Sequence, residues 1–347
     1  MPELSFHEWL SSGHSSIDRG IDGLIVMPTA SGAVLFSTSG PRGGVASYAL
    51  TSGPATLADF SHFERFWASD ALPEIRVLSP AGTPLIAVAA GGETGLWTYA
   101  PDADGQLGTA TLLSELGAET GPATDLAHDA TGRVYLADAL TGGFHAFDWT
   151  GSGYAPAETV TDAPVVYAED IVRLLSIDRD GQRYVVTASQ SENGVSAFAD
   201  TETGLAATGS LGADDGLGVM VPTDMASAQV GDRHFIILGS SAPSGEGGAI
   251  SVMELRESGA LLPVDHVTDT LATRFDALLA LDVIDAGGRT YVVAGGADDG
   301  ITLFVLLPDG RLHLLDAMAG GAGFSPGTVT ALTGWWDGVA LRVFATT

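Results

Sequence analysis

The chain has 347 residues, of which 45% are hydrophobic and 16% charged, and its formal net charge is -29 with no lysine and no cysteine. The apolar content supports a large buried core and excludes a disordered chain. The charge repels phosphate backbones and so excludes nucleic-acid binding through a basic surface, while the missing cysteines exclude disulfides, thiolate metal sites and cysteine nucleophiles.

Residues 1–19 stand apart from the rest of the chain. They contain neither the basic nor the apolar region of a signal peptide. Within them, ELSFHEWL alternates apolar and polar residues, which predicts a strand, with a short amphipathic helix as the alternative. No run anywhere approaches the roughly 18 apolar residues needed to cross a bilayer. We therefore expect no transmembrane segment.

From residue 22 onward the sequence repeats a unit of four short apolar segments separated by turns. The third unit shows the pattern best, with ATDLAHD, the turn DATGR, VYLADA and GGFHAFDW. A glycine precedes the third segment of six units, at Gly44, Gly95, Gly143, Gly194, Gly248 and Gly300, with separations of 51, 48, 51, 54 and 52 residues. A glycine at this place predicts a tight hairpin that needs a positive φ.

Four strands per unit, repeated six to seven times, predict an all-β chain folded as a β-propeller. We expect one domain over residues 1–347 with seven blades of four antiparallel strands, and eight blades as the less favoured count. The blades should start near residues 22, 75, 123, 169, 223, 275 and 328. A sandwich would not need the repeat, and a β-helix would have a much shorter period.

The seventh unit contains only TVTALTGWW and VALRVFATT. Its hairpin glycine would fall near residue 352, five residues beyond Thr347. We therefore expect the last blade to be incomplete, or to be closed by a strand from residues 1–19. We also expect the sequence to be the N-terminal part of a longer protein.

Five units open their first strand with an aspartate. The innermost strand of a propeller blade lines the central channel, so these side chains would form a carboxylate ring near one mouth, where calcium, a hard cation, would bind. The alternative is that each aspartate accepts hydrogen bonds from nearby backbone amides and holds neighbouring blades together. The candidate ligands are Asp22, Asp125, Asp170, Asp224 and Asp276.

Local catalytic motifs are missing. No two of the eight histidines have a metal-binding spacing, and neither G-x-S-x-G nor a phosphate-binding glycine loop occurs. His145 and His234 fall in predicted strands, where we expect each to be packed or exposed singly. The segment DRDG (178–181) departs from the EF-hand pattern and predicts a hairpin turn.

Units of the form TDLA, GRVYLADA and GGFHAF in an acidic chain resemble the N-terminal propeller segments of secreted RTX (hemolysin-type calcium-binding) proteins of alphaproteobacteria. The resemblance implies type I export without an N-terminal signal, and hence an extracellular or cell-surface location, with the cytoplasm as second choice. The family's G-G-x-G-x-D-x-U-x repeat does not occur here, so its calcium sites map to no residue. The units are also similar to lactonase-like seven-bladed propellers, although none of that family's catalytic positions can be matched.

Three functions follow as hypotheses. The first is a non-catalytic extracellular module that binds a protein or carbohydrate surface within a larger secreted calcium-binding protein. The second is a calcium-dependent hydrolase of the lactonase or phosphoesterase type with its site at the channel mouth. The third is a structural protein of an envelope or particle surface.

Overall fold

The computed structural model describes residues 3–30, 32–40, 43–63, 71–90, 95–116, 120–139, 142–242, 247–321 and 325–346. The chain divides into two compact units. The first, here called the N-terminal unit, is His7–Thr159. The second, the C-terminal unit, combines Met1–Phe6 with Val160–Thr347.

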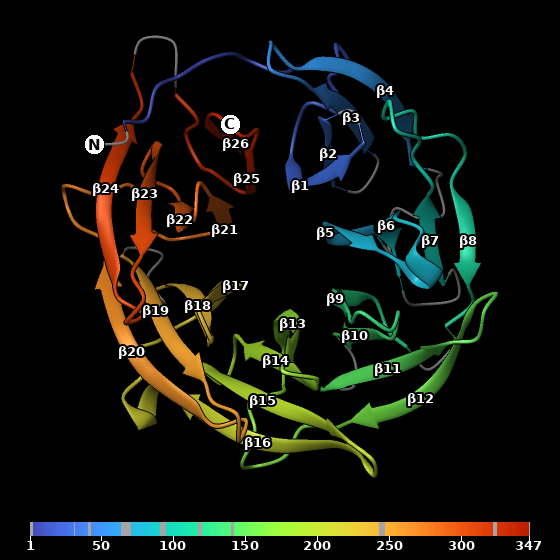
Figure 1. Ribbon diagram of the computed structural model, residues 1–347, viewed down its shortest axis with the longest axis vertical. Coiled ribbons are helices and arrows are strands. Elements are labelled where there is room, and N and C mark those ends of the chain that lie inside the picture. The colour runs from blue at the N-terminus through green and yellow to red at the C-terminus, as the bar shows by residue number, and fades with distance from the viewer. Residues whose placement is uncertain are drawn as a thin grey trace. The chain divides into compact units, whose positions relative to one another are not determined.

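The N-terminal unit consists of three antiparallel sheets, each with four strands in sequence order (Figure 1). The strands are β1 (Ile21–Thr29), β2 (Gly32–Ser39), β3 (Gly44–Leu50) and β4 (Thr56–His62); β5 (Ala71–Leu78), β6 (Leu85–Ala89), β7 (Leu96–Tyr99) and β8 (Thr111–Ser114); and β9 (Ala123–His128), β10 (Val134–Asp138), β11 (Phe144–Trp149) and β12 (Tyr154–Val160).

The C-terminal unit adds three more four-stranded sheets and one two-stranded sheet. Its strands are β13 (Ile171–Arg179), β14 (Gln182–Ser189), β15 (Gly194–Thr201) and β16 (Gly204–Gly212); β17 (Pro222–Val230), β18 (Arg233–Ser241), β19 (Gly248–Leu255) and β20 (Leu261–Thr268); β21 (Ala280–Ala286), β22 (Arg289–Gly295), β23 (Gly300–Leu306) and β24 (Leu312–Ala319); and β25 (Leu332–Trp336) and β26 (Leu341–Ala345).

Successive sheets of each unit meet through their first strands, so each four-stranded sheet is a propeller blade. In the N-terminal unit β1 contacts β5 and β5 contacts β9, and in the C-terminal unit the contacts run from β13 through β17 and β21 to β25. The apolar clusters lie between neighbouring blades. One cluster, for example, joins Ile177 and Val186 of the blade β13–β16 to Ile236 and Met253 of the blade β17–β20.

Strand β18 shows how the sequence builds this layered core. Ile236 and Leu238 pack toward the preceding blade, whereas Phe235 and Ile237 pack toward the following one. Successive side chains of a strand point to opposite faces, so a strand buried on both faces must be apolar throughout. Each such side chain contributes about 1.5–3 kcal/mol when it is fully buried.

The prediction of seven blades is wrong, because the described residues form six four-stranded blades, followed by the two-stranded sheet β25–β26. Residues 3–12 form no strand, so the expected N-terminal strand does not complete this sheet. Instead the Leu4 amide donates to Asp316 Oδ2 at 2.6 Å, and the Leu4 side chain packs beside the cluster that contains Val329 and Leu332.

The positive φ expected at the six repeated glycines does not explain most of them. Only Gly95 and Gly143 of the six have a positive φ, at 68° and 103°. At the others, backbone or a ring approaches too closely for a side chain. A methyl group on Gly248 would lie 1.9 Å from the Phe275 carbonyl oxygen, and one on Gly44 would lie 2.2 Å from that of Ser61. Glycine is needed here because neighbouring chain segments are close.

Helical structure within the described ranges is limited to short 3-10 turns. They are η2 (Pro80–Gly82) and η3 (Ala213–Asp215). No helix among these residues is long and apolar enough to span a membrane.

Candidate functional site

The first-strand aspartates make different contacts from one another. In the N-terminal unit, Asp125 on β9 lies 2.6 Å from Arg76 Nη2 on β5, and its side chain is 3% exposed. Arg76 also donates from Nε to the Leu126 carbonyl at 3.2 Å. The carboxylate therefore joins two neighbouring blades.

Asp224 on β17 has the same function in the C-terminal unit. Its Oδ1 accepts from Arg173 Nε on β13 at 2.7 Å, and its Oδ2 accepts from the Leu281 amide on β21 at 2.7 Å. One residue further along β21, Asp282 Oδ2 accepts from the Gly334 amide on β25 at 2.8 Å. Two carboxylates thus connect the first strands of three successive blades and of the two-stranded sheet that follows them.

The other three predicted ligands lie near the start of a first strand. The carbonyl oxygen of Asp170 accepts from the Gln190 amide at 3.0 Å, and Asp276 Oδ1 accepts from the Gly247 amide. Burial raises the pKa of Asp22 to about 7. Nowhere in the described ranges do three acidic or histidine side chains gather closely enough to hold a metal ion.

Asp125 and Asp224 do not fit calcium as they stand, because an arginine already supplies the cation. We considered two roles for these aspartates, calcium binding and holding neighbouring blades together. The contacts of Asp125 and Asp224 match the second role. Calcium binding by the five aspartates stays a prediction.

Two half-buried carboxyl groups, Asp22 and Asp282, predict that stability falls as pH rises. Burial raises the pKa of Asp282 to about 6, with the neighbouring Asp224 carboxylate adding to the effect. A carboxyl whose pKa is raised by folding stabilises the native state below its unfolded pKa, near 4, and this contribution is lost as pH rises through the folded value. The same direction holds for Asp22.

We therefore expect a higher melting temperature at pH 5 than at pH 8 by calorimetry. Because Asp282 is partly accessible to solvent, we take its share as about 1 kcal/mol, or roughly 2–4 °C. Asp282→Asn should reduce the difference. Equal melting temperatures at the two pH values would show that these groups titrate alike in the folded and unfolded chains.

A second polar group, in the N-terminal unit, joins an acid, an imidazole and a hydroxyl. His145 Nε2 lies 2.7 Å from Asp138 Oδ2, and His145 Nδ1 lies 3.0 Å from Thr159 Oγ1. The Asp138 side chain is fully buried, and that of His145 is 13% exposed. Thr159 is exposed. We call these residues the triad.

Three neighbouring strands position the triad at one end of their blade. Asp138 ends β10, His145 is the second residue of β11, and Thr159 lies near the end of β12. His145 is directly opposite Leu136 in the β10–β11 register. Asp138, two residues beyond Leu136, therefore lies on the same face as the imidazole. Gly142 and Gly143, both at positive φ, precede β11.

The carboxylate at this place is specific to this blade. The residues at the end of the second strand in two other blades are Ser39 and Ser189. Each donates its hydroxyl to a carbonyl of the segment that precedes its own blade, Ser16 or Glu169. In those two blades this position is therefore occupied by a hydroxyl that contacts backbone, whereas here a carboxylate at the same position contacts an imidazole.

The triad can activate a hydroxyl group. With Nε2 protonated, the imidazole donates to the buried carboxylate, and Nδ1 is then free to accept a proton from Thr159. His145 is packed, as one of the two expected arrangements, but the sequence did not reveal its contacts with Asp138 and Thr159. Sequence spacing gave no signal, because His145 and Thr159 meet only through the pairing of β11 with β12.

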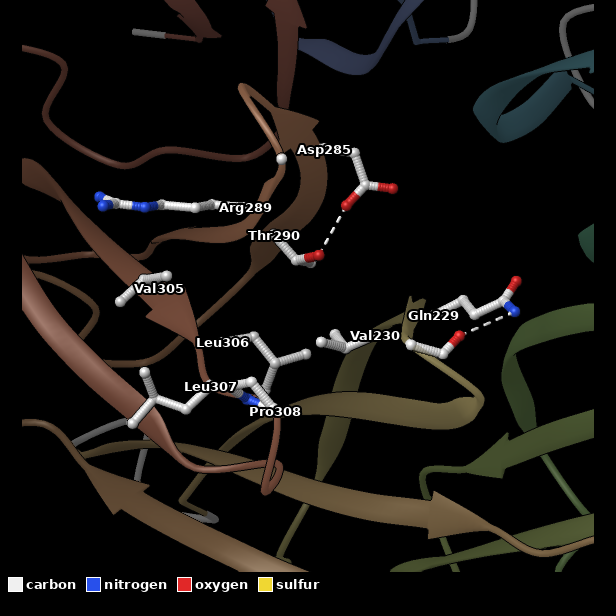
Figure 2. Close-up of a pocket in the computed structure, with 11 residues that line it drawn as sticks. Gln229, Val230, Asp285, Arg289, Thr290, Val305, Leu306, Leu307 and Pro308 are labelled. Atoms are coloured by element: carbon white, nitrogen blue, oxygen red, sulfur yellow. Dashed lines mark hydrogen bonds between the residues drawn. The ribbon is translucent and has the colours of Figure 1, made fainter.

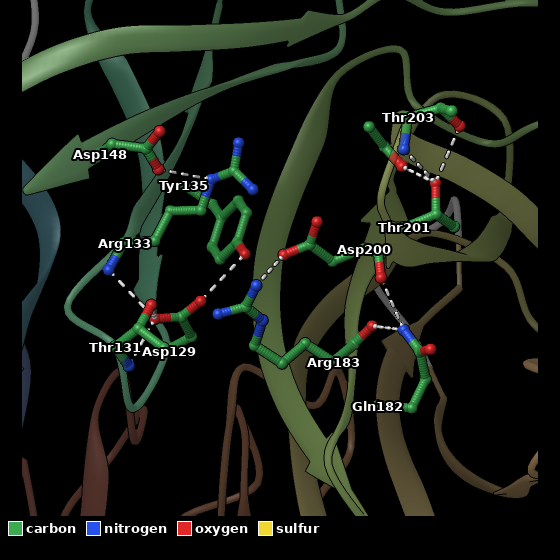
Figure 3. A network of polar contacts seen from close by, with 11 residues as sticks. Asp129, Thr131, Arg133, Tyr135, Asp148, Gln182, Arg183, Asp200, Thr201 and Thr203 are labelled. Atoms are coloured by element: carbon green, nitrogen blue, oxygen red, sulfur yellow. Dashed lines mark hydrogen bonds and ion pairs between the residues drawn. The ribbon is translucent and has the colours of Figure 1, made fainter.

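Other polar groups form turns and sheet contacts (Figure 3). In the N-terminal unit, Asp129 Oδ1 accepts from the Thr131 and Arg133 amides at 2.8 and 3.0 Å, which stabilises the DATGR turn. In the C-terminal unit, Arg183 pairs with Asp200 at 2.5 Å across β14 and β15. These contacts are explained by local structure.

One further histidine contacts a hydroxyl. Ser251 Oγ lies 2.9 Å from His266 Nδ1, and Ser251 is buried while His266 is exposed. No carboxylate contacts this imidazole among the described residues. The pair therefore has a hydroxyl and an imidazole but lacks the acid that the triad contains.

Comparisons with known proteins identify the fold. No family model and no curated protein matches the chain. Two similar solved structures, each described as a "putative 6-phosphogluconolactonase", come from Bacteroides uniformis (13% identity, TM-score 0.62) and Bacteroides fragilis (14%, 0.61). They match 92% of this chain and 87% and 86% of their own.

A protein of unknown function from Desulfotomaculum acetoxidans is also similar, with 10% identity and a TM-score of 0.55 over 94% of this chain and 90% of its own. The comparisons support the resemblance to lactonase-like propellers and give no support to the one with RTX proteins. Taken together with the six four-stranded blades, they show that this chain is a β-propeller.

Proposed function

We propose that this protein is a hydrolase of lactones or related esters and that the triad is its catalytic group. The observation that carries the proposal is the pair of contacts at 2.7 and 3.0 Å that link a fully buried carboxylate, an imidazole and an exposed hydroxyl. The fold similarity to the Bacteroides proteins supports the same class of reaction.

The proposed reaction has two halves. Thr159 Oγ1 attacks the carbonyl carbon of the lactone while its proton passes to His145 Nδ1. The ring C–O bond then breaks, and the leaving oxygen takes the proton from His145, which leaves an acyl group on Thr159. Water attacks the acyl group and gives a proton to His145, and the hydroxy acid leaves as the Thr159 hydroxyl is restored. Asp138 orients the imidazole and stabilises its charged form.

Charge restricts the substrate class. The net charge of -29 repels an approaching anion, so a neutral lactone or ester is favoured over a phosphorylated one. For the same reason the phosphoesterase alternative is less favoured than the lactonase alternative.

The test is hydrolysis of a panel of neutral lactones and aryl esters by the wild-type protein and by His145→Ala. A pH-stat measures the acid that each reaction releases. We expect turnover by the wild type and a loss of about 10³-fold or more in kcat for the variant. His266→Ala serves as the matched control and should keep full activity. If the wild type hydrolyses nothing on the panel, or if His145→Ala is as active as the wild type, the triad is not catalytic.

A binding module is the second candidate function. Two apolar side chains of the C-terminal unit are unusually exposed, Leu271 between β20 and β21 at 97% and Val165 before β13 at 79%. Such residues favour a protein partner, as in an extracellular adhesion module of a larger secreted protein. Turnover that depends on His145 would refute the non-catalytic form of this proposal.

A further inference from the structure

A pocket of about 530 Å³ lies where two neighbouring blades of the C-terminal unit, β17–β20 and β21–β24, present their turns (Figure 2). Its lining comes from the β17–β18 turn, the β21–β22 turn, and the end of β23 with the turn that follows. The residues are Gln229, Val230, Gly231, Asp285, Gly288, Arg289, Thr290, Val305, Leu306, Leu307 and Pro308.

The internal repeat gives two positions of this pocket an equivalent at the preceding pair of blades. Val230 pairs with Arg233 to close the β17–β18 hairpin, just as Arg179 pairs with Gln182 to close β13–β14. Leu306 of the following blade corresponds in register to Leu255. The pocket is therefore the counterpart of the place between Arg179 and Leu255 at the preceding pair of blades.

At that preceding pair, an arginine side chain occupies the corresponding place. Arg179 is 8% exposed and donates from Nη1 to the Leu255 carbonyl oxygen of the next blade. Its aliphatic stem and guanidinium thus extend from one blade to the next. Where Arg179 is replaced by the shorter Val230, the corresponding space is a pocket.

The pocket also offers acceptors to a cation. Asp285 Oδ1 accepts from Thr290 Oγ1 at 2.6 Å, and Oδ2 has no partner in the described part of the chain. Gln229 donates from Nε2 to the Gly231 carbonyl at 3.2 Å, which leaves its own Oε1 without a partner in the same part. Figure 2 shows the Arg289 side chain extending away from Asp285. Val230 and Leu306 supply apolar surface to the same pocket.

From these contacts we infer that the pocket binds a guanidinium group on an aliphatic stem, in the place that Arg179 fills one blade earlier. Asp285 Oδ2 and Gln229 Oε1 accept from the guanidinium, and Val230 and Leu306 contact the stem. The ligand is either a free alkylguanidine or an arginine side chain of a peptide. The acidic surface raises the local concentration of such cations.

Calorimetric titration tests this inference with agmatine, representing the free ligand, and acetyl-Gly-Arg-Gly-amide, representing the peptide source. Butylurea, the neutral probe, should not bind. We expect at least one cation to bind, with Asp285→Asn weakening it about 10-fold or more. The control is Asp232→Asn, which removes one exposed charge outside the lining and should change the affinity less than 3-fold.

Val230→Arg restores the side chain of the preceding blade and should abolish binding while the melting temperature is maintained. Three results would overturn the inference: no binding of either cation, equal binding of butylurea, or equal weakening by Asp285→Asn and Asp232→Asn. The last would show attraction to the acidic surface alone. Binding of only one cation identifies the source of the ligand.

Discussion

Replacing Asp224 by alanine is expected to lower the free energy of unfolding by about 3–5 kcal/mol. The variant leaves the buried Arg173 guanidinium without its carboxylate, and it leaves the Leu281 amide without its acceptor. Both side chains of the ion pair are only 9% exposed, so water cannot replace the lost partner. Urea unfolding at pH 7 measures the change.

A matched control lies in the same unit. Asp309 pairs with Arg311 at 2.7 Å, but these side chains are 52% and 64% exposed, so Asp309→Ala should leave the unfolding midpoint unchanged. The double variant Arg173→Met/Asp224→Leu should recover most of the loss, because it removes both buried charges. Equal midpoints for Asp224→Ala and Asp309→Ala would show that the buried pair does not hold these blades together.

Within the triad, Asp138→Asn and Thr159→Val are each expected to lower kcat by about 10³–10⁴-fold. The asparagine cannot hold the imidazole in the tautomer that accepts the Thr159 proton, and valine removes the nucleophile with little change in volume. Because the three residues act as a unit, combining either change with His145→Ala should cost little more than the single variants. Steady-state hydrolysis of the best substrate from the panel measures these effects.

Two further readouts separate catalysis from structure. Thr159 is exposed near the end of a strand, so Thr159→Val should leave the melting temperature unchanged, and Thr159→Ser should keep measurable activity. If Thr159→Val stays active while His145→Ala is inactive, His145 acts as a base toward water and Thr159 is not the nucleophile. Loss of activity only in proportion to loss of folded protein would make the triad a structural group.

The repeat in the sequence was sufficient to predict the propeller and most of its strands. The blades were expected near 123 and 223, and their first strands β9 and β17 begin at Ala123 and Pro222. This worked because strand alternation, turn residues and repeat period are local properties. The reason for the glycines was not local, since at Gly248 the obstacle is Phe275, which lies far along the chain.

The number of blades depended on contacts that no sequence pattern specifies. The seventh unit was expected either to be incomplete or to gain a strand from residues 1–19, because ELSFHEWL alternates as a strand does. In the structure Leu4 reaches Asp316 through a single amide, and no sheet forms there. The alternation of apolar and polar residues predicts which side chains could face a core. It does not show whether another strand is available to pair with the segment.

The sequence by itself determined that this is an acidic, all-β repeat protein whose first strands carry aspartates. The tertiary structure decided what those residues do, because the role of a carboxylate depends on the groups that it contacts. Asp125 and Asp224 meet arginines of adjacent blades, whereas Asp138, which no motif marked, meets His145 and through it Thr159. These partners come from strand register and blade packing, which set distances that spacing along the chain does not contain.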